Sequence, residues 1–129
     1  MESGKTEEIL KQMNLWEKRE RHPMSLSGGE KQRTAVASAL VQDRKIFVFD
    51  EPTSGLDYKN MKNVANALTE LQRKGKSVFV ITHDLELIYQ CCTSVIFFRD
   101  SGILWQSKLD AECAKRLETF FCYSSEKYS

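Results

Sequence analysis

The chain has 129 residues, which is enough for one domain with a hydrophobic core. Its 19 basic and 18 acidic residues nearly cancel, and neither kind gathers in a tail, which argues against a nucleic-acid scaffold or an electrostatic membrane binder. No apolar run reaches the ~20 residues of a membrane span. We find no secretory signal, and the four cysteines lack metal-binding spacing, so we expect reduced cysteines in a cytosolic protein.

The first predicted helix lies upstream of Pro23. Thr6 is the expected N-cap, because two acidic residues follow it in the first turn, and Ile9, Leu10 and Met13 share one face. Pro23 disfavours helical backbone at the residue before it, so this helix is expected to end before residue 23.

The segment LSGGE at residues 26–30 opens the next predicted helix, which continues to about residue 41. The first N–H groups of a helix have no acceptor within it and its dipole is positive at this end, so helix starts of this kind bind anions. Gly28 and Gly29 would let a phosphate approach the backbone closely. The pattern alone is weak, because a Ser-Gly-Gly turn before a helix is usually only a turn. Alanines at positions 35, 37 and 39 indicate close packing on a sheet.

Apolar runs and helical stripes alternate from residue 46 onward. Residues 46–49 and 77–82 are continuous runs, which fit parallel strands buried on both faces. Between them we predict a helix with Asp57 as its N-cap and Gly75 at its end. Four apolar residues line one face of this helix: Met61, Val64, Leu68 and Leu71.

The remaining elements continue this alternation. A short helix from Asp84 leads to a third strand at residues 94–98, and a turn at 100–102 leads to a short strand at 103–106. The last helix has an apolar face made of Cys113, Ala114, Leu117, Phe120 and Phe121. Alternating strands and helices predict an α/β fold with helices on the faces of a parallel sheet.

Two carboxylates, Asp50 and Glu51, follow the apolar run at residues 46–49. Ligands of open α/β sheets bind at this carboxyl-terminal edge of the strands. A strand can also end in an acidic residue simply because it meets solvent. That reading is common for one carboxylate and less so for Asp-Glu followed by Pro-Thr-Ser-Gly-Leu-Asp at residues 52–57.

Four segments together resemble the motifs of ABC-type ATPases, in that family's order and spacing. They are LSGGE at residues 26–30 (the signature segment), DEPT at 50–53 (the end of the Walker B strand), SGLD at 54–57 (the D-loop) and THD at 82–84, which contains the switch histidine. The likeness extends from about residue 7 to 106.

The resemblance implies an incomplete P-loop NTPase (RecA-like) core, with parallel strands flanked by helices, joined to the end of the helical subdomain. The whole chain would then be the C-terminal part of one ABC ATPase domain. Residues 1–27 would end the helical subdomain, residues 28–106 would form the core, and residues 107–129 would form a C-terminal helix and tail.

The family's roles can be carried over residue by residue. Asp50 would hold Mg²⁺, mostly through water, Glu51 would orient and deprotonate the attacking water, and His83 would hydrogen-bond the γ-phosphate of ATP. The D-loop residues Ser54 and Asp57 would lie at a dimer interface. The signature residues would close over the ATP held by a partner domain: Ser27, Gly28, Gly29 and Glu30.

The family's phosphate loop, G-x-x-x-x-G-K-[ST] between a strand and a helix, is not found. The letters GKT at residues 4–6 match only its end, and no strand can precede them in this sequence. In the family, the strand before that loop lies between the two strands expected here at 77–82 and 94–98. We therefore expect these strands either to keep unpaired inner edges or to close up against each other, and the isolated chain to be inactive.

The resemblance implies an ATP-hydrolysing subunit of a membrane transporter, peripheral on the cytoplasmic face of the membrane. Its partners would be a second ABC ATPase domain and transmembrane subunits, without nucleic acid. Residues 55–58 and 81–87 are most similar to energy-coupling-factor importers. The alternative is a non-hydrolytic remnant that offers its signature segment to a complete partner ATPase domain.

Overall fold

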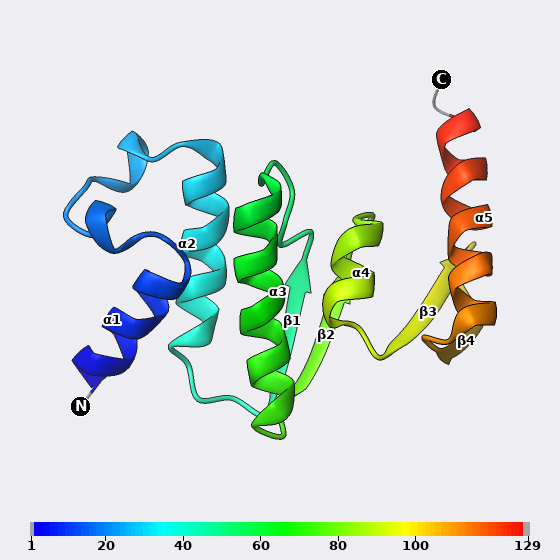
Figure 1. The fold of residues 1–129 in the computed structure, drawn as a ribbon, viewed down its shortest axis with the longest axis horizontal. Helices are drawn as coiled ribbons and strands as arrows, with labels where there is room; N and C mark the ends of the chain where they lie inside the picture. The colour runs from blue at the N-terminus through cyan, green and yellow to red at the C-terminus, as the bar shows by residue number, and fades with distance from the viewer. Residues whose placement is uncertain (1, 128–129) are drawn as a thin grey trace. The chain divides into compact units, whose positions relative to one another are not determined.

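A computed structural model describes residues 2–127 of the chain, and the side chains of residues 4–122. It divides into two compact units, Met1–Cys91 and Cys92–Ser129. The elements of the first unit are α1 (Glu2–Gln12), the 3-10 helices η1 (Trp16–Lys18) and η2 (Pro23–Ser25), α2 (Gly28–Leu40), β1 (Ile46–Asp50), α3 (Tyr58–Arg73), β2 (Ser77–Ile81) and α4 (Leu85–Cys91). Those of the second are β3 (Ser94–Arg99), β4 (Gly102–Lys108) and α5 (Ala111–Lys127) (Figure 1). No helix in the described range is both long and apolar enough to cross a bilayer.

The first unit is built on the parallel pair β1–β2, in which Phe47 lies beside Val78 and Asp50 beside Ile81. Helix α3 makes the crossover between these strands, as a parallel connection requires. Figure 1 shows α2 and α3 side by side, with α3 next to the two strands. Phe47 and Phe49 point into a core shared with α1, α2 and α3. The predicted α/β arrangement is therefore confirmed for this unit.

The opposite face of the β1–β2 pair is bare. Four large apolar side chains on it are more than half exposed: Ile46 (60%), Val48 (65%), Phe79 (52%) and Ile81 (55%). The prediction of strands buried on both faces was wrong, because no described element of this unit packs on that face. A continuous apolar run shows that both faces of a strand could be buried, but it does not show that another element covers each face.

Helix α1 begins at Glu2, so the prediction of Thr6 as its N-cap was wrong. Thr6 lies one turn inside the helix, and Ile9 and Met13 are buried against the core as expected. The helix therefore extends upstream of Thr6, and Thr6 does not cap it. The letters GKT at residues 4–6 consequently lie within α1, without a preceding strand in the described chain.

Helix α2 begins at Gly28, as predicted, and Ser27 is its N-cap. Ser27 Oγ accepts a hydrogen bond from the Glu30 N–H (3.1 Å), and Glu30 Oε1 accepts one from the Ser27 N–H (2.9 Å), which makes a capping box. Lys18 Nζ lies 3.2 Å from the second carboxylate oxygen of Glu30. These bonds to Ser27 and then to Lys18 lower the pKa of Glu30 to about 2. Of the three alanines expected against the sheet, Ala37 is buried, Ala39 is partly buried against the core and Ala35 is exposed.

Helix α3 has the predicted ends and the predicted buried stripe. Asp57 Oδ1 accepts a hydrogen bond from the Asn60 N–H (2.9 Å). The helix ends at Arg73 with Lys74 as its C-cap, and Gly75 follows with a φ of +82°, which suits glycine. Its buried face includes the four expected residues: Met61, Val64, Leu68 and Leu71.

The second unit is an antiparallel hairpin, β3–β4, with α5 packed on it. Asp100 and Ser101 form the turn with positive φ values of 48° and 68°. Phe97 packs against Trp105 and against Phe120 of α5. The third strand, β3, pairs with β4, and it has no ladder hydrogen bonds to β2 in the described chain. In the described chain, β2 pairs with β1 alone, so the first alternative for the expected gap, unpaired inner edges, is the one observed.

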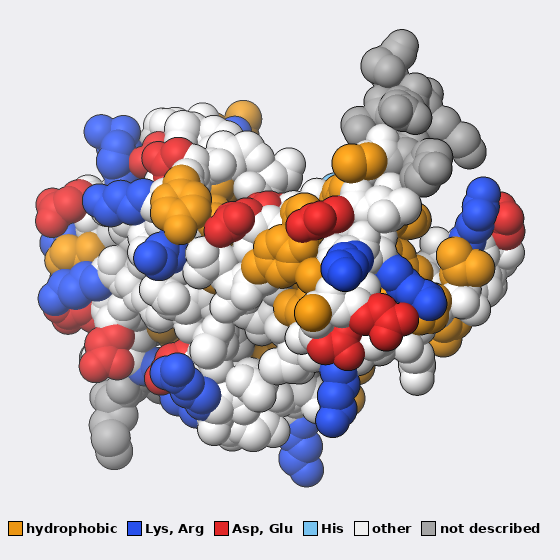
Figure 2. All heavy atoms as spheres, turned by 45° about the vertical axis from the view of Figure 1, so that its right-hand side comes forward, with side chains coloured by type: hydrophobic (Ala, Val, Ile, Leu, Met, Phe, Trp, Pro, Cys, Tyr) orange, Lys and Arg blue, Asp and Glu red, His pale blue; other side chains and the backbone are white. Residues whose placement is uncertain are grey.

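The hairpin also has one bare face. Ile96 and Phe98 alternate with the buried Phe97 and are 43% and 67% exposed. Figure 2 shows hydrophobic side chains (orange) exposed on the surface between charged side chains (blue and red). Each unit therefore covers one face of its two-stranded sheet and leaves apolar side chains of the other face in solvent.

Adjacent residues of β1 give a direct test of this one-sided burial. Phe47→Ala should lower the free energy of unfolding by about 3–5 kcal/mol, because Phe47 is 5% exposed in the core. Val48→Ala should change it by no more than about 0.5 kcal/mol, because Val48 is 65% exposed. Urea unfolding followed by circular dichroism measures both. Equal losses would mean that the bare face is buried in solution.

The capping box predicts a pH dependence. The pKa of Glu30 is lowered in the folded chain to about 2 from 4.5, so its stabilisation is present above pH 4.5 and is lost as the pH falls toward 2. Glu30→Gln should therefore unfold more easily than the native chain at pH 6, and this difference should shrink as the pH approaches 2. Glu8→Gln, at an exposed position on α1, is the control. A difference that does not vary with pH would contradict the assignment.

Candidate functional site

The carboxyl-terminal ends of β1 and β2 bring two predicted catalytic residues together. The Glu51 N–H donates to the Ile81 carbonyl (2.8 Å), which adds one bond to the parallel ladder beyond Asp50. His83 follows β2 by two residues, and its Nδ1 lies 2.6 Å from Glu51 Oε1. The Glu51 side chain is 36% exposed and that of His83 is 82% exposed. A carboxylate and an imidazole thus share a hydrogen bond at the open edge of the sheet.

Glu51 has a left-handed backbone conformation, with φ of +49°. This region is unfavourable for a residue other than glycine and persists where surrounding contacts hold it. The Glu51 carbonyl accepts two hydrogen bonds, from Gln32 Nε2 (2.7 Å) and from the Ser54 N–H (3.2 Å). The carboxylate is therefore presented from a backbone that is fixed on both sides.

A second polar network, which the sequence did not reveal, fixes the loop that carries His83. Thr53 is 5% exposed, and its hydroxyl donates to Asp84 Oδ2 at 2.7 Å. The other oxygen of Asp84 accepts from the Leu87 N–H (3.2 Å) and caps α4, while the Asp84 N–H donates to Thr82 Oγ1 (2.9 Å). The hydrogen bond from Thr53 to Asp84 thus connects the loop that contains Glu51 to the loop that contains His83. A threonine in a loop and an aspartate at a helix start carry no signal of this 31-residue contact.

The two glycines of the signature segment differ in their surroundings. A Cβ added to Gly28 would meet nothing within 4 Å, whereas one added to Gly29 would come 3.3 Å from Leu56 Cδ2 and 3.8 Å from the Gly55 carbonyl. Packing on the D-loop accounts for Gly29. The space above Gly28 is open, and the N–H groups of this first turn have no acceptor within the helix. An anion can therefore approach the backbone at Gly28.

The two polar residues of the signature segment, Ser27 and Glu30, are engaged within the chain. Ser27 Oγ accepts from the helix, which leaves its hydroxyl hydrogen available to a ligand. Both oxygens of Glu30 have partners, Ser27 and Lys18. No hydrogen bond among the described residues joins Ser27 or Glu30 to Glu51 or His83. Gln32, on the same helix, is the residue that reaches Glu51.

Asp50 and the D-loop residues lie around the same edge. The Asp50 carboxylate is exposed, and no hydrogen bond or ion pair within the described structure engages it. No cluster of three or more His, Cys, Asp or Glu residues in that part of the chain could enclose a metal. This donor set fits Mg²⁺, which typically binds one or two carboxylates together with phosphate oxygens and water. Ser54 supports the Glu51 carbonyl, and Asp57 caps α3.

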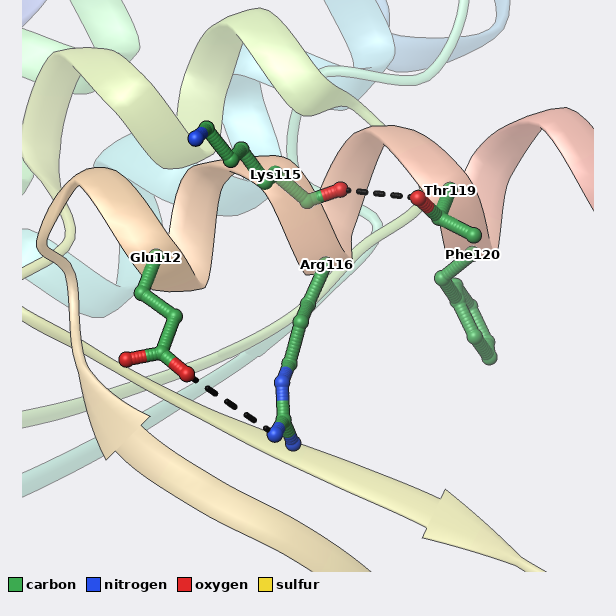
Figure 3. A pocket seen from close by; sticks show the side chains of 5 residues that line it. All are labelled: Glu112, Lys115, Arg116, Thr119 and Phe120. Carbon is green, nitrogen blue, oxygen red and sulfur yellow. Dashed lines mark hydrogen bonds and ion pairs between the residues drawn. The ribbon is translucent and has the colours of Figure 1, made fainter.

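Two further features lie outside the predicted site. Arg33 of α2 is 5% exposed, and its Nε and Nη1 have no hydrogen-bond partner in the described structure. The sequence did not indicate that this arginine is buried. Figure 3 shows a pocket formed on α5. It is lined by Glu112, Lys115, Arg116, Thr119 and Phe120, none of which belongs to the predicted site.

Known proteins that resemble this chain in sequence and those that resemble it in structure belong to the same family. The sequence model of a family described as "ABC transporter" matches residues 2–54. A putative ABC transporter ATP-binding protein of Treponema denticola is 41% identical over 116 residues, which are 88% of this chain and 24% of that protein. The arginine transport ATP-binding protein ArtM of Bacillus subtilis is 39% identical over 78% of this chain and 41% of its own length.

A solved structure described as a dimeric bacterial ABC transporter cassette superposes on this chain with a TM-score of 0.73. It is 34% identical, and the match covers 82% of this chain and 46% of that one. The chain therefore spans less than half of the length of each of these relatives. The fold is that of an ABC ATPase cassette, represented in part. The chain belongs to the family of ABC transporter ATP-binding domains.

Proposed function

We propose that this chain is the C-terminal part of the ATP-hydrolysing domain of an ABC transporter. The observation that carries the proposal is the 2.6 Å contact between Glu51 and His83 beside the free carboxylate of Asp50. An acid that can activate water, a histidine and a metal-binding carboxylate at one sheet edge are the groups that phosphoryl transfer to water needs.

In this proposal, Glu51 accepts a proton from the attacking water, and His83 holds the γ-phosphate while its hydrogen bond keeps the Glu51 carboxylate aligned. Asp50 would hold Mg²⁺ through water, and the ion would neutralise charge on the phosphate oxygens. The chain's own contribution is positioning and electrostatics. The left-handed backbone of Glu51 and the Thr53–Asp84 bond hold the two side chains in place.

The signature segment would act on a second ATP, held by a partner ATPase domain. The open space above Gly28 supports this role, because packing within the chain does not require a glycine there. Ser27 would donate its hydroxyl hydrogen to that phosphate. Glu30 would contribute by holding Ser27, since both of its oxygens are engaged within the chain. Ser54 and Asp57 would lie at the interface between the two domains.

The direction of transport is proposed from the relatives. ArtM is named for arginine transport, and other relatives are named for methionine import, which favours an importer. We place the chain with importers of the energy-coupling-factor type on the residues of its D-loop and switch region. Its partners would be transmembrane subunits, and it would work at the cytoplasmic face of the membrane.

A second candidate is a non-hydrolytic module that donates its signature segment to a complete partner ATPase domain. Two observations favour it. Residues 4–6, the only match to a phosphate loop in the described chain, lie within helix α1, where their backbone cannot cradle a phosphate. The bare apolar face of β1–β2 also indicates a surface that associates.

Mixing the chain with an ABC ATPase domain that has its own phosphate loop tests both candidates. We expect no Mg²⁺-dependent ATP hydrolysis by the chain alone, and stimulated hydrolysis in the mixture. Gly28→Asp should abolish the stimulation, because its carboxylate would occupy the space of the phosphate. Gly75→Asp would be a poor control, because the φ of +82° at Gly75 would strain any other residue. Gly4→Asp, at an open helical position, is the matched control.

Glu51→Gln then separates the two candidates. Loss of stimulation in this variant supports hydrolysis at this chain's own site, and retained stimulation supports the module. No stimulation by the native chain at any ratio would contradict both, and robust turnover by the isolated chain that Glu51→Gln abolishes would contradict the expected inactivity.

The metal role of Asp50 gives a further prediction. In the stimulated mixture, Asp50→Asn should raise the Mg²⁺ concentration for half-maximal activity by about tenfold, because a neutral amide oxygen binds a hard cation more weakly than a carboxylate does. A magnesium titration of the ATPase rate measures this. Asp43→Asn, at an exposed position paired with Lys76, is the control. An unchanged titration would remove Asp50 from the metal site.

A further inference from the structure

Gln32 connects helix α2 to the loop that follows β1. Its Nε2 donates to the Glu51 carbonyl at 2.7 Å, between residues 19 apart in sequence and in a partly buried setting. Gln32 takes no part in the capping box at the start of α2, which uses Ser27 and Glu30. The bond therefore contributes to the Glu51 loop and not to the beginning of its own helix.

The Glu51 peptide needs such support, because its φ of +49° is unfavourable for a residue with a side chain. Its N–H is held by the Ile81 carbonyl at 2.8 Å. Its carbonyl is held by the Ser54 N–H at 3.2 Å and, at the shorter distance of 2.7 Å, by Gln32. The orientation of this peptide sets the direction in which the Glu51 side chain leaves the backbone, and so whether its carboxylate meets His83.

We propose that Gln32 is a positioning residue for Glu51, which links the glycine start of α2 to the catalytic carboxylate. The inference deepens the proposed function and rests on it for its catalytic meaning. Gly28 and Gly29 begin the helix, and Gln32 follows about one turn later. A shift of this end of α2 on meeting a partner's nucleotide would move the Gln32 amide, and with it the peptide that presents Glu51. The two ATP sites to which one chain contributes would thereby be coupled.

A second contact supports the same link. The position of Gly29 against Leu56 leaves only 3.3 Å for an added Cβ, so the first turn of α2 also packs on the loop after Glu51. The beginning of α2 therefore touches this loop at two places, Glu51 and Leu56. Motion of the helix start relative to the loop would disturb both contacts.

The test compares Gln32→Met with Gln42→Met in the full chain. Methionine keeps the length of glutamine and removes its donor. Gln42, just after α2, is the matched control, because its Nε2 also donates to a backbone carbonyl, that of Ser38 in α2 (3.3 Å). Amide hydrogen exchange at Glu51 and Ser54, and the imidazole nitrogen resonances of His83, report on the Glu51 peptide and its carboxylate without requiring activity.

In Gln32→Met, exchange at the Glu51 and Ser54 amides should quicken by about fivefold, the factor that one hydrogen bond of about 1 kcal/mol supplies, and the His83 Nδ1 resonance should shift. Gln42→Met should match the native chain at these positions. Unchanged exchange in Gln32→Met would overturn the proposal. So would a uniform quickening across the chain that matches a lower free energy of unfolding, since Gln32 would then only stabilise the fold.

The kinetic arm uses the mixture with a complete ATPase domain. Gln32→Met should lower kcat by about tenfold with KM nearly unchanged, because a misplaced carboxylate affects the chemical step more than nucleotide binding. An unchanged kcat would overturn the positioning role. If the native mixture shows no hydrolysis, the proposed function fails, and the exchange and resonance measurements still decide whether Gln32 holds Glu51.

Discussion

The parallel pairing of β1 with β2 is the constraint on which the rest of the site depends. Its register places Asp50 beside Ile81, and the Glu51 N–H extends the ladder by one bond to the Ile81 carbonyl. Because the strands run in the same direction, the residues that follow them emerge at one edge, and His83 comes within 2.6 Å of Glu51. A slip by one residue would exchange the faces of the whole strand and separate these side chains. The core of α1, α2 and α3 against Phe47 and Phe49 holds that register.

The two sheets share one feature, which is that each is covered by helices on one face only. Each two-stranded sheet buries one face against its own helices and leaves apolar residues such as Val48 and Phe98 exposed on the other. The chain spans 24% of one relative and 41% of another, so the relatives contain much sequence that has no counterpart here. The family resemblance places a strand between β2 and β3. In the described chain, β2 pairs with β1 alone and β3 pairs with β4, so no strand there occupies that position beside β2.

Local chemistry made much of the structure predictable. The cap at Asp57 and the stop at Gly75 each act within a few residues, so the ends of α3 could be derived from sequence. The motif residues Asp50, Glu51 and His83 were placed correctly at a sheet edge because strand ends are local too. Thr6 failed as a cap because helical backbone continues upstream of it.

What could not be predicted depends on contacts distant in sequence. The bare faces follow from which elements are present to cover a strand, and a run such as residues 46–49 is apolar in either case. The bonds Gln32–Glu51 and Thr53–Asp84 join polar residues of ordinary type across 19 and 31 positions, with no periodicity that would reveal them.

The hairpin β3–β4 has a different consequence, for the order of folding. Its strands are joined by the turn at Asp100 and Ser101, so its contacts are nearly local, whereas β1 and β2 meet only after a loop that contains all of α3 has closed. Since closing longer loops costs more entropy and slows folding, the hairpin should form first, and the edge that carries Glu51 and His83 should be completed later.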